Sequence, residues 1–479
     1  MSSLFEHETL RWLLLAIYTV SAVVTASHAL LHKRDPRSAW GWIAACWLFP
    51  LAGAILYYLF GVNRLQQRAK KLMGTPPPLT ATSHETPSPR LLSVVGVDPV
   101  ELRELVRIGG AMTTLPLAFG NRVEMLRNGE QAYPAMLKAI AEAQQSIDLC
   151  TYIFEAGTVG DEFVAALIAA HARGVQVRVL VDGMSALFFA SPVHQQLQAK
   201  GVKTARFLPP RWFPPMLHVN LRNHRKLLVI DSRIAFTGGM NIRDGHLLSA
   251  PKDEATADLQ FRLQGPVVQQ LEQCFIDDWQ FATGESISRN VQTAGEGDTA
   301  CRVITDGPNE DLDKLVMILT GALANAHHRV LILTPYFIPN AALLAAMQAA
   351  ALRGVEVHLL LPARSDQRYV DWAARKYLEQ LLHHQVKVWL QPAPFAHTKL
   401  LVVDGFYAQI GSANLDQRSL RLNFELVVEL YDRNFVQTLA DYAESARAQS
   451  VALTLAQLDS RSLAVRLRDS LCWLFSPYL

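Results

Sequence analysis

Residues 224–242 read HRKLLVIDSRIAFTGGMNI, and residues 397–415 read HTKLLVVDGFYAQIGSANL. Nine of these nineteen positions are identical without a gap. The similarity extends upstream, because ARGVQVRVLVDG at 172–183 resembles LRGVEVHLLLPA at 352–363, and SIDLCTYIF at 146–154 resembles VLILTPYFI at 330–338. A repeat of this length is too long for a solenoid unit, so it indicates two similar domains.

Each copy has the same expected order of elements. An apolar strand is followed by an Ala-rich helical stretch (161–173 or 341–353), by a second apolar strand, and later by the strand of the repeated motif. Strands that alternate with helices are typical of α/β folds. We therefore predict an α/β sandwich in each half of the chain.

The motif spacing in each copy is H-x-K-x4-D. His224 and Lys226 are two residues apart, as are His397 and Lys399, so on a strand each pair shares one face. Imidazole can attack phosphorus or carry a proton near neutral pH. Lysine and asparagine can hold the non-bridging oxygens of a phosphodiester. Two copies would supply one histidine for each side of an in-line displacement.

Each apolar run then reaches an aspartate, Asp231 or Asp404, and a turn of small residues that ends in Asn241 or Asn414. Turns of this kind let the backbone approach an anion closely. We expect the two aspartates to bind local backbone and to position the strand, although they belong to the motif. The sequence has no carboxylate cluster of the two-metal kind, so we expect neither a metal nor another cofactor.

The composition excludes several classes of protein. Of the 479 residues, 50% are hydrophobic and 18% are charged, and the net charge is +2. These values argue against a disordered chain and against a nucleic-acid partner. The five cysteines form no C-x-x-C pair, which rules out a zinc ribbon and a disulfide framework.

Two uncharged N-terminal stretches, 12–31 and 39–60, are long enough to cross a bilayer. The first could instead be a cleaved signal peptide, which its acidic flank disfavours, and the second could be a buried core helix. Pro50 would kink the second stretch in either setting. We predict a transmembrane helical hairpin. Five basic residues lie on the side of the large domain, against three in the turn at 32–38, and this difference favours a cytoplasmic position of the large domain.

We divide the chain into an N-terminal tail with two transmembrane helices (1–61), a basic and Pro-rich linker (62–115), and two α/β domains (116–295 and 296–479). The second domain ends in a helix with an apolar stripe of four leucines between arginines. This helix either packs on the protein or lies on anionic lipid. The loop at 206–217, RFLPPRWFPPML, either enters the membrane interface or packs on its own domain.

The paired motifs resemble those of the phospholipase D superfamily. Further segments are similar to bacterial cardiolipin synthases: TYIFE at 151–155, TPYFIPN at 334–340, SDQRYVDWAAR at 365–375 and GSANLDQRSLRLNFEL at 411–426. The resemblance implies two pseudo-symmetric phospholipase D-like domains that share one active site. It also implies an enzyme of the bacterial inner membrane that joins two phosphatidylglycerols and releases glycerol through a phosphohistidine intermediate.

The resemblance also implies that a later carboxylate orients each histidine. We expect Asp258 to serve His224, the predicted nucleophile, and Glu425 to serve His397, the predicted acid–base. Glu425 lies in an apolar run, LNFELVVEL, where an unpaired acid would be costly.

Alternative functions remain open at this point. They are a hydrolytic phospholipase D, a phosphatidyltransferase with another alcohol acceptor, a superfamily nuclease and a catalytically silent membrane scaffold. The near-neutral charge weighs against the nuclease, and two intact motifs weigh against the scaffold. The sequence also leaves open which of the two histidines is the nucleophile and which way the chain lies in the membrane. The oligomeric state, the acyl-chain preference and the use of phosphatidylethanolamine as a substrate are left open as well.

Overall fold

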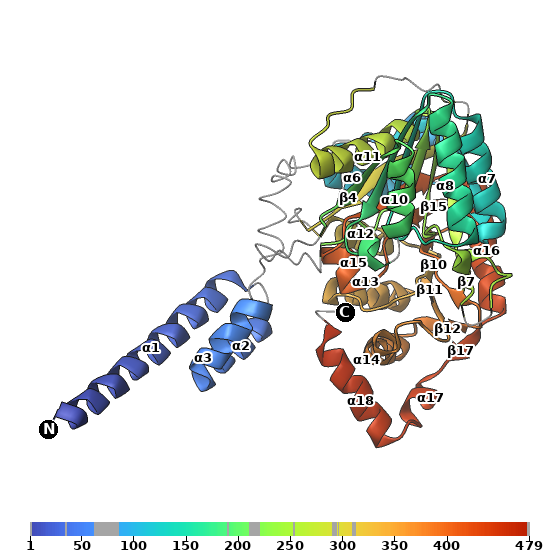
Figure 1. The fold of residues 1–479 in the computed structure, drawn as a ribbon. Coiled ribbons are helices and arrows are strands. Elements are labelled where there is room, and N and C mark those ends of the chain that lie inside the picture. The colour runs from blue at the N-terminus through green and yellow to red at the C-terminus, as the bar shows by residue number, and fades with distance from the viewer. Residues whose placement is uncertain are drawn as a thin grey trace. The chain divides into compact units, whose positions relative to one another are not determined.

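The structure is a computed structural model. It describes residues 2–33, 36–61, 86–188, 191–209, 221–251, 254–289, 295, 297–308 and 313–476. The chain forms two compact units, Met1–Leu72 and Met73–Leu479 (Figure 1).

In its described residues, the first unit contains three helices and a π-helical turn: α1 (Ser2–His32), α2 (Pro36–Leu48), α3 (Pro50–Leu56) and η1 (Tyr57–Gly61). The Ser21 hydroxyl of α1 donates to the carbonyl of Pro50 at 3.2 Å. Among the described residues, only Arg11–His32 forms a helix long and apolar enough to cross a membrane. The predicted second span is not one continuous helix. It breaks at Phe49, because Pro50 lacks the N–H that would continue it.

A sheet of fifteen strands runs through the second unit. The first half contributes β1 (Ala118–Arg127), β2 (Ser146–Thr151), β3 (Gln176–Asp182), β4 (Lys203–Phe207), β5 (Leu227–Ile230), β6 (Ile234–Gly238) and β8 (Leu259–Gln264). The second half contributes β9 (Thr299–Asp306), β10 (Arg329–Leu333), β11 (Glu356–Pro362), β12 (Lys387–Gln391), β14 (Leu400–Val403), β15 (Tyr407–Gly411), β16 (Glu425–Tyr431) and β17 (Val451–Leu453).

The strand order is nearly a palindrome. Outward from the centre, the first half runs β1-β8-β6-β5-β2-β3-β4, and the second runs β9-β16-β15-β14-β10-β11-β12 with β17 added at its edge. In each half the strand of the motif pairs antiparallel with the strand that opens the repeat, β5 with β2 and β14 with β10. The halves join through the antiparallel pairing of β1 with β9. The predicted duplication is therefore visible as one continuous, pseudo-symmetric sheet.

Helices cover both faces of this sheet (Figure 1). On one face lie α7 (Asn128–Glu142), α8 (Thr158–Ala172) and α10 (Ser191–Ala199), with the equivalent α12 (Lys314–Ala324), α13 (Ala341–Leu352) and α14 (Arg368–His383). On the other face, α11 (Val267–Thr283) follows β8, and α16 (Arg433–Ala448) follows β16. The predicted α/β fold of two similar halves is confirmed, and the predicted helical stretches are α8 and α13.

The part of the predicted linker that the structure describes is not extended. It contains α5 (Pro89–Val95) and α6 (Pro99–Met112). Ser88 and Asp98 cap these helices, and a proline follows each cap, which is a favoured helix start. Leu91 and Leu102 are buried in the same apolar core as Leu315 of α12, so these helices belong to the packing of the second half.

The predicted lipid loop is also partly regular. Arg206 and Phe207 end strand β4, and the Phe207 side chain is fully buried. Residues 210–217 of the predicted loop lie outside the described residues.

Candidate active site

The two motifs meet where the halves exchange backbone hydrogen bonds. His224 and Lys226 directly precede β5, and His397 and Lys399 directly precede β14. The His224 amide donates to the Phe424 carbonyl at 3.0 Å. In the other half, β13 (Phe395–Ala396) pairs with β7 (Thr256–Ala257), and the His397 amide donates to the Ala257 carbonyl at 2.8 Å. Each histidine is thus fixed beside a segment of the opposite half.

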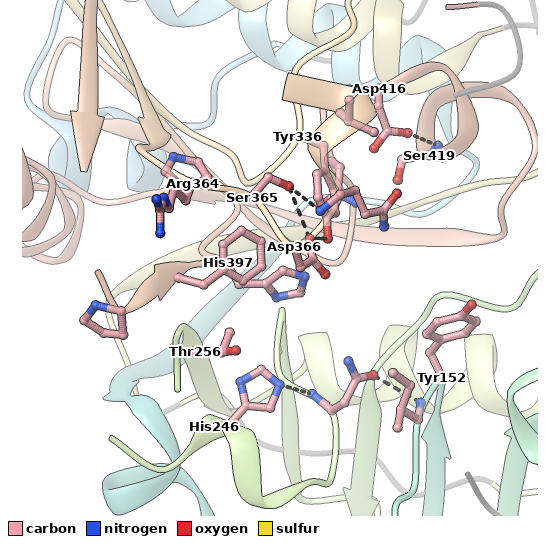
Figure 2. Close-up of a pocket in the computed structure, with 18 of the residues that line it drawn as sticks. Tyr152, His246, Thr256, Tyr336, Arg364, Ser365, Asp366, His397, Asp416 and Ser419 are labelled. Carbon is pink, nitrogen blue, oxygen red and sulfur yellow. Dashed lines mark hydrogen bonds between the residues drawn. The ribbon is translucent and has the colours of Figure 1, made fainter. Parts of the chain in front are cut away.

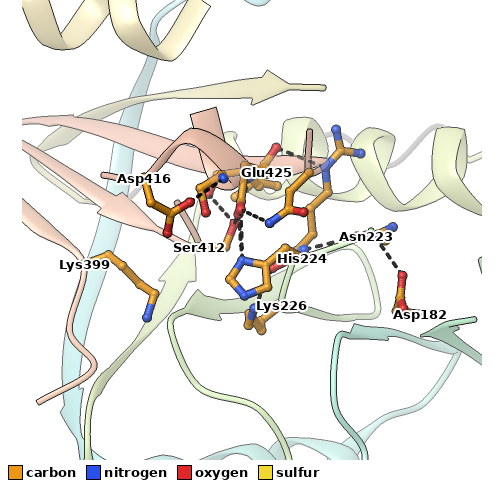
Figure 3. Close-up of polar contacts among 12 residues, drawn as sticks. Asp182, Asn223, His224, Lys226, Lys399, Ser412, Asp416 and Glu425 are labelled. Carbon is orange, nitrogen blue, oxygen red and sulfur yellow. Dashed lines mark hydrogen bonds and ion pairs between the residues drawn. The ribbon is translucent and has the colours of Figure 1, made fainter. Parts of the chain in front are cut away.

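This exchange pairs each histidine with the carboxylate of the other half. His224 Nδ1 lies 3.0 Å from Glu425 Oε2, and His397 Nδ1 lies 2.7 Å from Asp258 Oδ2 (Figure 3 shows the first pair). The predicted pairing within each half is wrong. Because Glu425 directly follows Phe424 and Asp258 directly follows Ala257, the cross-half backbone contacts bring each carboxylate to the opposite histidine.

The carboxylates also fix the proton on each ring. An ionised carboxylate only accepts hydrogen bonds, so Nδ1 carries the proton and Nε2 keeps its lone pair. Glu425 is fully buried and accepts from the Ser412 hydroxyl at 2.5 Å and the Asn423 amide at 3.2 Å. Burial raises the Glu425 pKa, but its partners, His224 first, outweigh this and hold the pKa below its usual value.

In the repeat alignment, Gly239 of the first half corresponds to Ser412. A Cβ at Gly239 would stand 2.5 Å from both oxygens of Asp258, so the absence of a side chain makes room for this carboxylate. The glycines that precede these two positions, Gly238 and Gly411, also leave no space for a side chain. A Cβ there would meet the Leu259 carbonyl at 2.6 Å or the Leu426 carbonyl at 2.2 Å. Close approach of the neighbouring strand, rather than of an anion, therefore explains the first glycine of each turn.

Both histidines are held toward the neutral form. Burial lowers the pKa of His224, although Glu425 opposes this. Burial also lowers the pKa of His397, and the nearby Lys399 adds to the effect. A neutral imidazole with a free Nε2 is the form that attacks phosphorus. Lys399 Nζ lies 3.0 Å from Nε2 of His397, whereas Nε2 of His224 has no such contact among the described residues, so His224 has the attacking form.

Each lysine contacts the histidine of its own motif, and Lys399 Nζ lies 2.8 Å from Nδ1 and 3.0 Å from Nε2 of His397. Lys226 Nζ donates to the His224 carbonyl at 2.7 Å, and Lys399 Nζ donates to the His397 carbonyl at 2.5 Å. Burial lowers the pKa of Lys226 to about 7 and that of Lys399 to about 8. A phosphate anion in the site would favour the charged form of both.

Both asparagines of the motif turns line the cavity between the halves. Asn241 Oδ1 accepts from the Ile153 amide at 3.2 Å. Asn414 Oδ1 is buried and has no hydrogen-bond partner among the described residues. A buried carboxamide without a partner is costly unless a ligand satisfies it.

The motif aspartates lie elsewhere, at the far ends of their strands. Asp231 accepts from the amides of Gln144, Gln145 and Ser146 at 2.7–2.9 Å. Asp404 accepts from three amides at 327–329 at 2.7–2.9 Å. Neither aspartate lines the cavity. The expectation that they bind backbone is met, and the geometry makes them positioning residues.

The aspartates give a prediction for stability. Replacing Asp231 with Ala should leave three amides without an acceptor and cost about 2 kcal/mol of stability. Turnover below the melting transition should change less than threefold or so, since Asp231 does not touch the cavity. Thermal unfolding by circular dichroism, with turnover at low temperature, checks this. Asp404→Ala is the matched variant, and lost turnover with an unchanged melting temperature would contradict the assignment.

The cavity between the halves has a volume of about 600 Å³. In Figure 2, Tyr152, His246 and Thr256 of the first half face His397, Tyr336 and Asp366 of the second half across the hollow. His224 lines the same space. The structure therefore brings four of the predicted site residues together at this cavity, both motif histidines and both motif asparagines.

One cavity histidine was missed by the sequence prediction. His246, at the end of η2 (Asp244–His246), is buried, and its ring centroid lies 6.1 Å from that of His397. Burial lowers its pKa to about 3. The repeat alignment could have indicated His246 as a site residue, because His246 and Ser419 each follow a motif asparagine by five residues. Both residues line the cavity.

The chain matches two known protein families. The family profile "Cardiolipin synthase, PLD-like domain" matches residues 136–279 and 319–447, and "Phospholipase_D-nuclease N-terminal" matches residues 9–61. The cardiolipin synthase of Geobacillus kaustophilus is 31% identical over 478 residues, which cover 97% of this chain and 94% of that protein.

The chain belongs to the cardiolipin synthase family of the phospholipase D superfamily. The major cardiolipin synthase of Bacillus subtilis is another relative, 30% identical over 98% of this chain and 99% of its own length. The crystal structure of phosphatidylserine synthase from Haemophilus influenzae superposes with a TM-score of 0.62 at 16% identity. It covers 79% of this chain and 100% of that chain, and shows the shared fold.

Proposed function

We propose that the chain transfers a phosphatidyl group from one phosphatidylglycerol to another and yields cardiolipin and glycerol. The observation that carries this proposal is the pair of crossed histidine–carboxylate contacts facing one cavity, with one histidine from each half. Membership in the cardiolipin synthase family supports the choice of phospholipid substrates.

In the first step, His224 Nε2 attacks the phosphorus of one phosphatidylglycerol. The P–N bond forms, the P–O bond to the terminal glycerol breaks, and His397 gives its proton to the departing oxygen. His397 is neutral in the empty site, so it acquires this proton when the phosphodiester anion enters and raises the pKa of the ring. Glu425 holds His224 in the attacking tautomer.

In the second step, glycerol leaves and the free hydroxyl of a second phosphatidylglycerol enters. His397 takes the hydroxyl proton, the oxygen attacks phosphorus, and the P–N bond breaks to release cardiolipin. Lys226, Lys399 and the two motif asparagines stabilise the charge on the non-bridging oxygens. Among the described residues, no group of three or more His, Cys, Asp or Glu side chains is placed to hold a metal ion.

Product analysis tests this function. Purified protein with phosphatidylglycerol should give cardiolipin and glycerol in equal amounts. Because the acceptor is an alcohol and one phosphodiester replaces another, excess glycerol should drive cardiolipin back to phosphatidylglycerol. Phosphatidic acid as the main product, with no effect of glycerol, would make the protein a hydrolase instead.

We also propose a multi-pass protein of the bacterial inner membrane. Residues 1–61 form its membrane part, and 116–295 and 296–479 form two cytoplasmic halves, with α5 and α6 added to the second half. Support comes from the apolar helix Arg11–His32, the match at residues 9–61 and the excess of basic residues beside the large domain. Ser38→Cys, near the start of α2, should react with an impermeant thiol reagent outside intact spheroplasts. Reaction only after lysis would reverse the orientation.

A further inference from the structure

The C-terminal helix α18 (Leu463–Leu474) carries an apolar face that no part of the described chain covers. Its four stripe leucines are 61–71% exposed: Leu463, Leu467, Leu471 and Leu474. Phe475, directly after the helix, is 58% exposed. At the α-helical period these leucines span about 80° of the circumference, so they form one continuous strip. Monomeric soluble proteins rarely expose a contiguous apolar surface of this kind.

The opposite face of α18 is firmly attached to the protein. Asp469 is buried and pairs with Arg461 and, at 2.7 Å, with Arg468. The Arg468 guanidinium lies 4.1 Å from the ring centroid of Trp372 in α14. The exposed leucines are therefore held in place by contacts behind them rather than by a frayed terminus.

The same attachment connects α18 to the active site. Cys472 of α18 packs against the apolar cluster that contains Val370 and Ala373 of α14 and Tyr336. Val370 and Tyr336 also line the active-site cavity. The apolar strip thus lies on a helix that backs the wall of the cavity.

We propose that α18 docks on the membrane surface, with its leucine strip in the lipid and its arginines at the headgroups. Arg466 is exposed on one side of the strip, and Arg468, which also pairs with Asp469, is 42% exposed on the other side, as in helices that lie in an anionic interface. The only acidic residue of the helix is the buried, paired Asp469, so its exposed surface is apolar and cationic. Docking would hold the cavity wall beside the leaflet that supplies the anionic phosphatidylglycerol.

A depth measurement tests the docking without reference to activity. The full chain carries Cys472→Ala, and Leu471→Cys is labelled with a fluorescent thiol reagent. The labelled protein is placed, one copy per disc, in lipid nanodiscs that contain phosphatidylglycerol and a nitroxide lipid. The nitroxide should quench the label at 471 at least twofold. The control is Leu352→Cys. Leu352 is 64% exposed at the end of α13 and lies shortly before the start of β11, whose other end, at Pro362, lines the cavity. The label at 352 should not be quenched.

Equal quenching at 471 and 352, or none at 471, would overturn the proposal. Shielding at 471 only in discs with two copies would make the strip a contact between chains and would also overturn it.

A second readout rests on the proposed function. Leu467→Asp with Leu471→Asp should lower turnover of phosphatidylglycerol vesicles at least fivefold and change turnover of short-chain, detergent-dispersed substrate less than twofold. Leu352→Asp should leave both unchanged. An equal loss on both substrates would contradict docking. If wild-type protein makes no cardiolipin, the proposed function fails while the quenching result still stands on its own.

Discussion

With a phosphatidyl p-nitrophenyl ester as substrate, His397→Ala should release a burst of about one nitrophenolate per active site and then stop. Nitrophenolate leaves without a proton, so the first step does not need His397. The second step does, because the acceptor hydroxyl must lose its proton, and the variant should stall as a phosphorylated protein. Steady turnover should fall on the order of 10³-fold or more.

His224→Ala is the matched variant and should give no burst, since it lacks the nucleophile. Because burial keeps the His224 ring neutral at neutral pH, the burst rate of His397→Ala should be level there and fall only in acid, as the ring gains a proton. Stopped-flow absorbance measures both quantities. A burst in His224→Ala but not in His397→Ala would exchange the two roles. If neither variant shows a burst while wild type does, the two histidines do not have separate roles as nucleophile and acid–base.

The crossed carboxylates give the second prediction. Glu425→Gln should slow the burst itself, by about 10²- to 10⁴-fold, because Glu425 holds the proton on His224 Nδ1. Asp258→Asn should spare the burst and slow the second step, because Asp258 contacts His397. Pre-steady-state and steady-state rates of the two variants separate these effects.

Double variants provide the control for this assignment. Adding Glu425→Gln to His224→Ala should lower the residual turnover little further, since the two residues act as one unit. For the same reason, adding Asp258→Asn to His397→Ala should lower its turnover little further. If Asp258→Asn abolishes the burst while Glu425→Gln leaves it intact, the carboxylates act within their own halves, against the geometry.

Much of this arrangement follows from the duplication. Two apolar runs, LLVI and LLVV, become equivalent buried strands, β5 and β14, and the repeated segments before them become β2 and β10. Because the same sequence pattern occurs in both halves, it predicts the same local structure in both. The backbone role of Asp231 could also be anticipated, because the residue ends its strand.

Contacts between the copies could not be predicted in this way. Nothing near His224 in the sequence shows that its amide bonds to Phe424, and that contact alone decides that Glu425 is its partner. Sequence distance favoured Asp258, 34 residues away, and the fold favours Glu425, 201 residues away. The contact of His246 with His397 is also one between the two halves, and the sequence holds only its place five residues after Asn241 as a signal.

Local signals were also outweighed at two places. The prolines before residue 90 indicated a linker, yet Ser88-Pro89 and Asp98-Pro99 start helices whose leucines enter the second core. In the N-terminal unit, the uncharged length of 39–60 indicated one span, but Pro50 divides it. Packing against the second half therefore outweighed the prolines before residue 90, whereas at Pro50 a single proline outweighed the apolar length.

The central claim is that a histidine of the first half carries the phosphatidyl group to an acceptor activated by the second half. The most direct measurement is to incubate His397→Ala with phosphatidyl p-nitrophenyl ester radiolabelled at phosphorus, stop the reaction in alkali, digest the protein and locate the label by mass spectrometry. We predict about one phosphatidyl adduct per chain, on His224. Label on any other residue, or free phosphatidic acid with an unlabelled protein, would contradict the account.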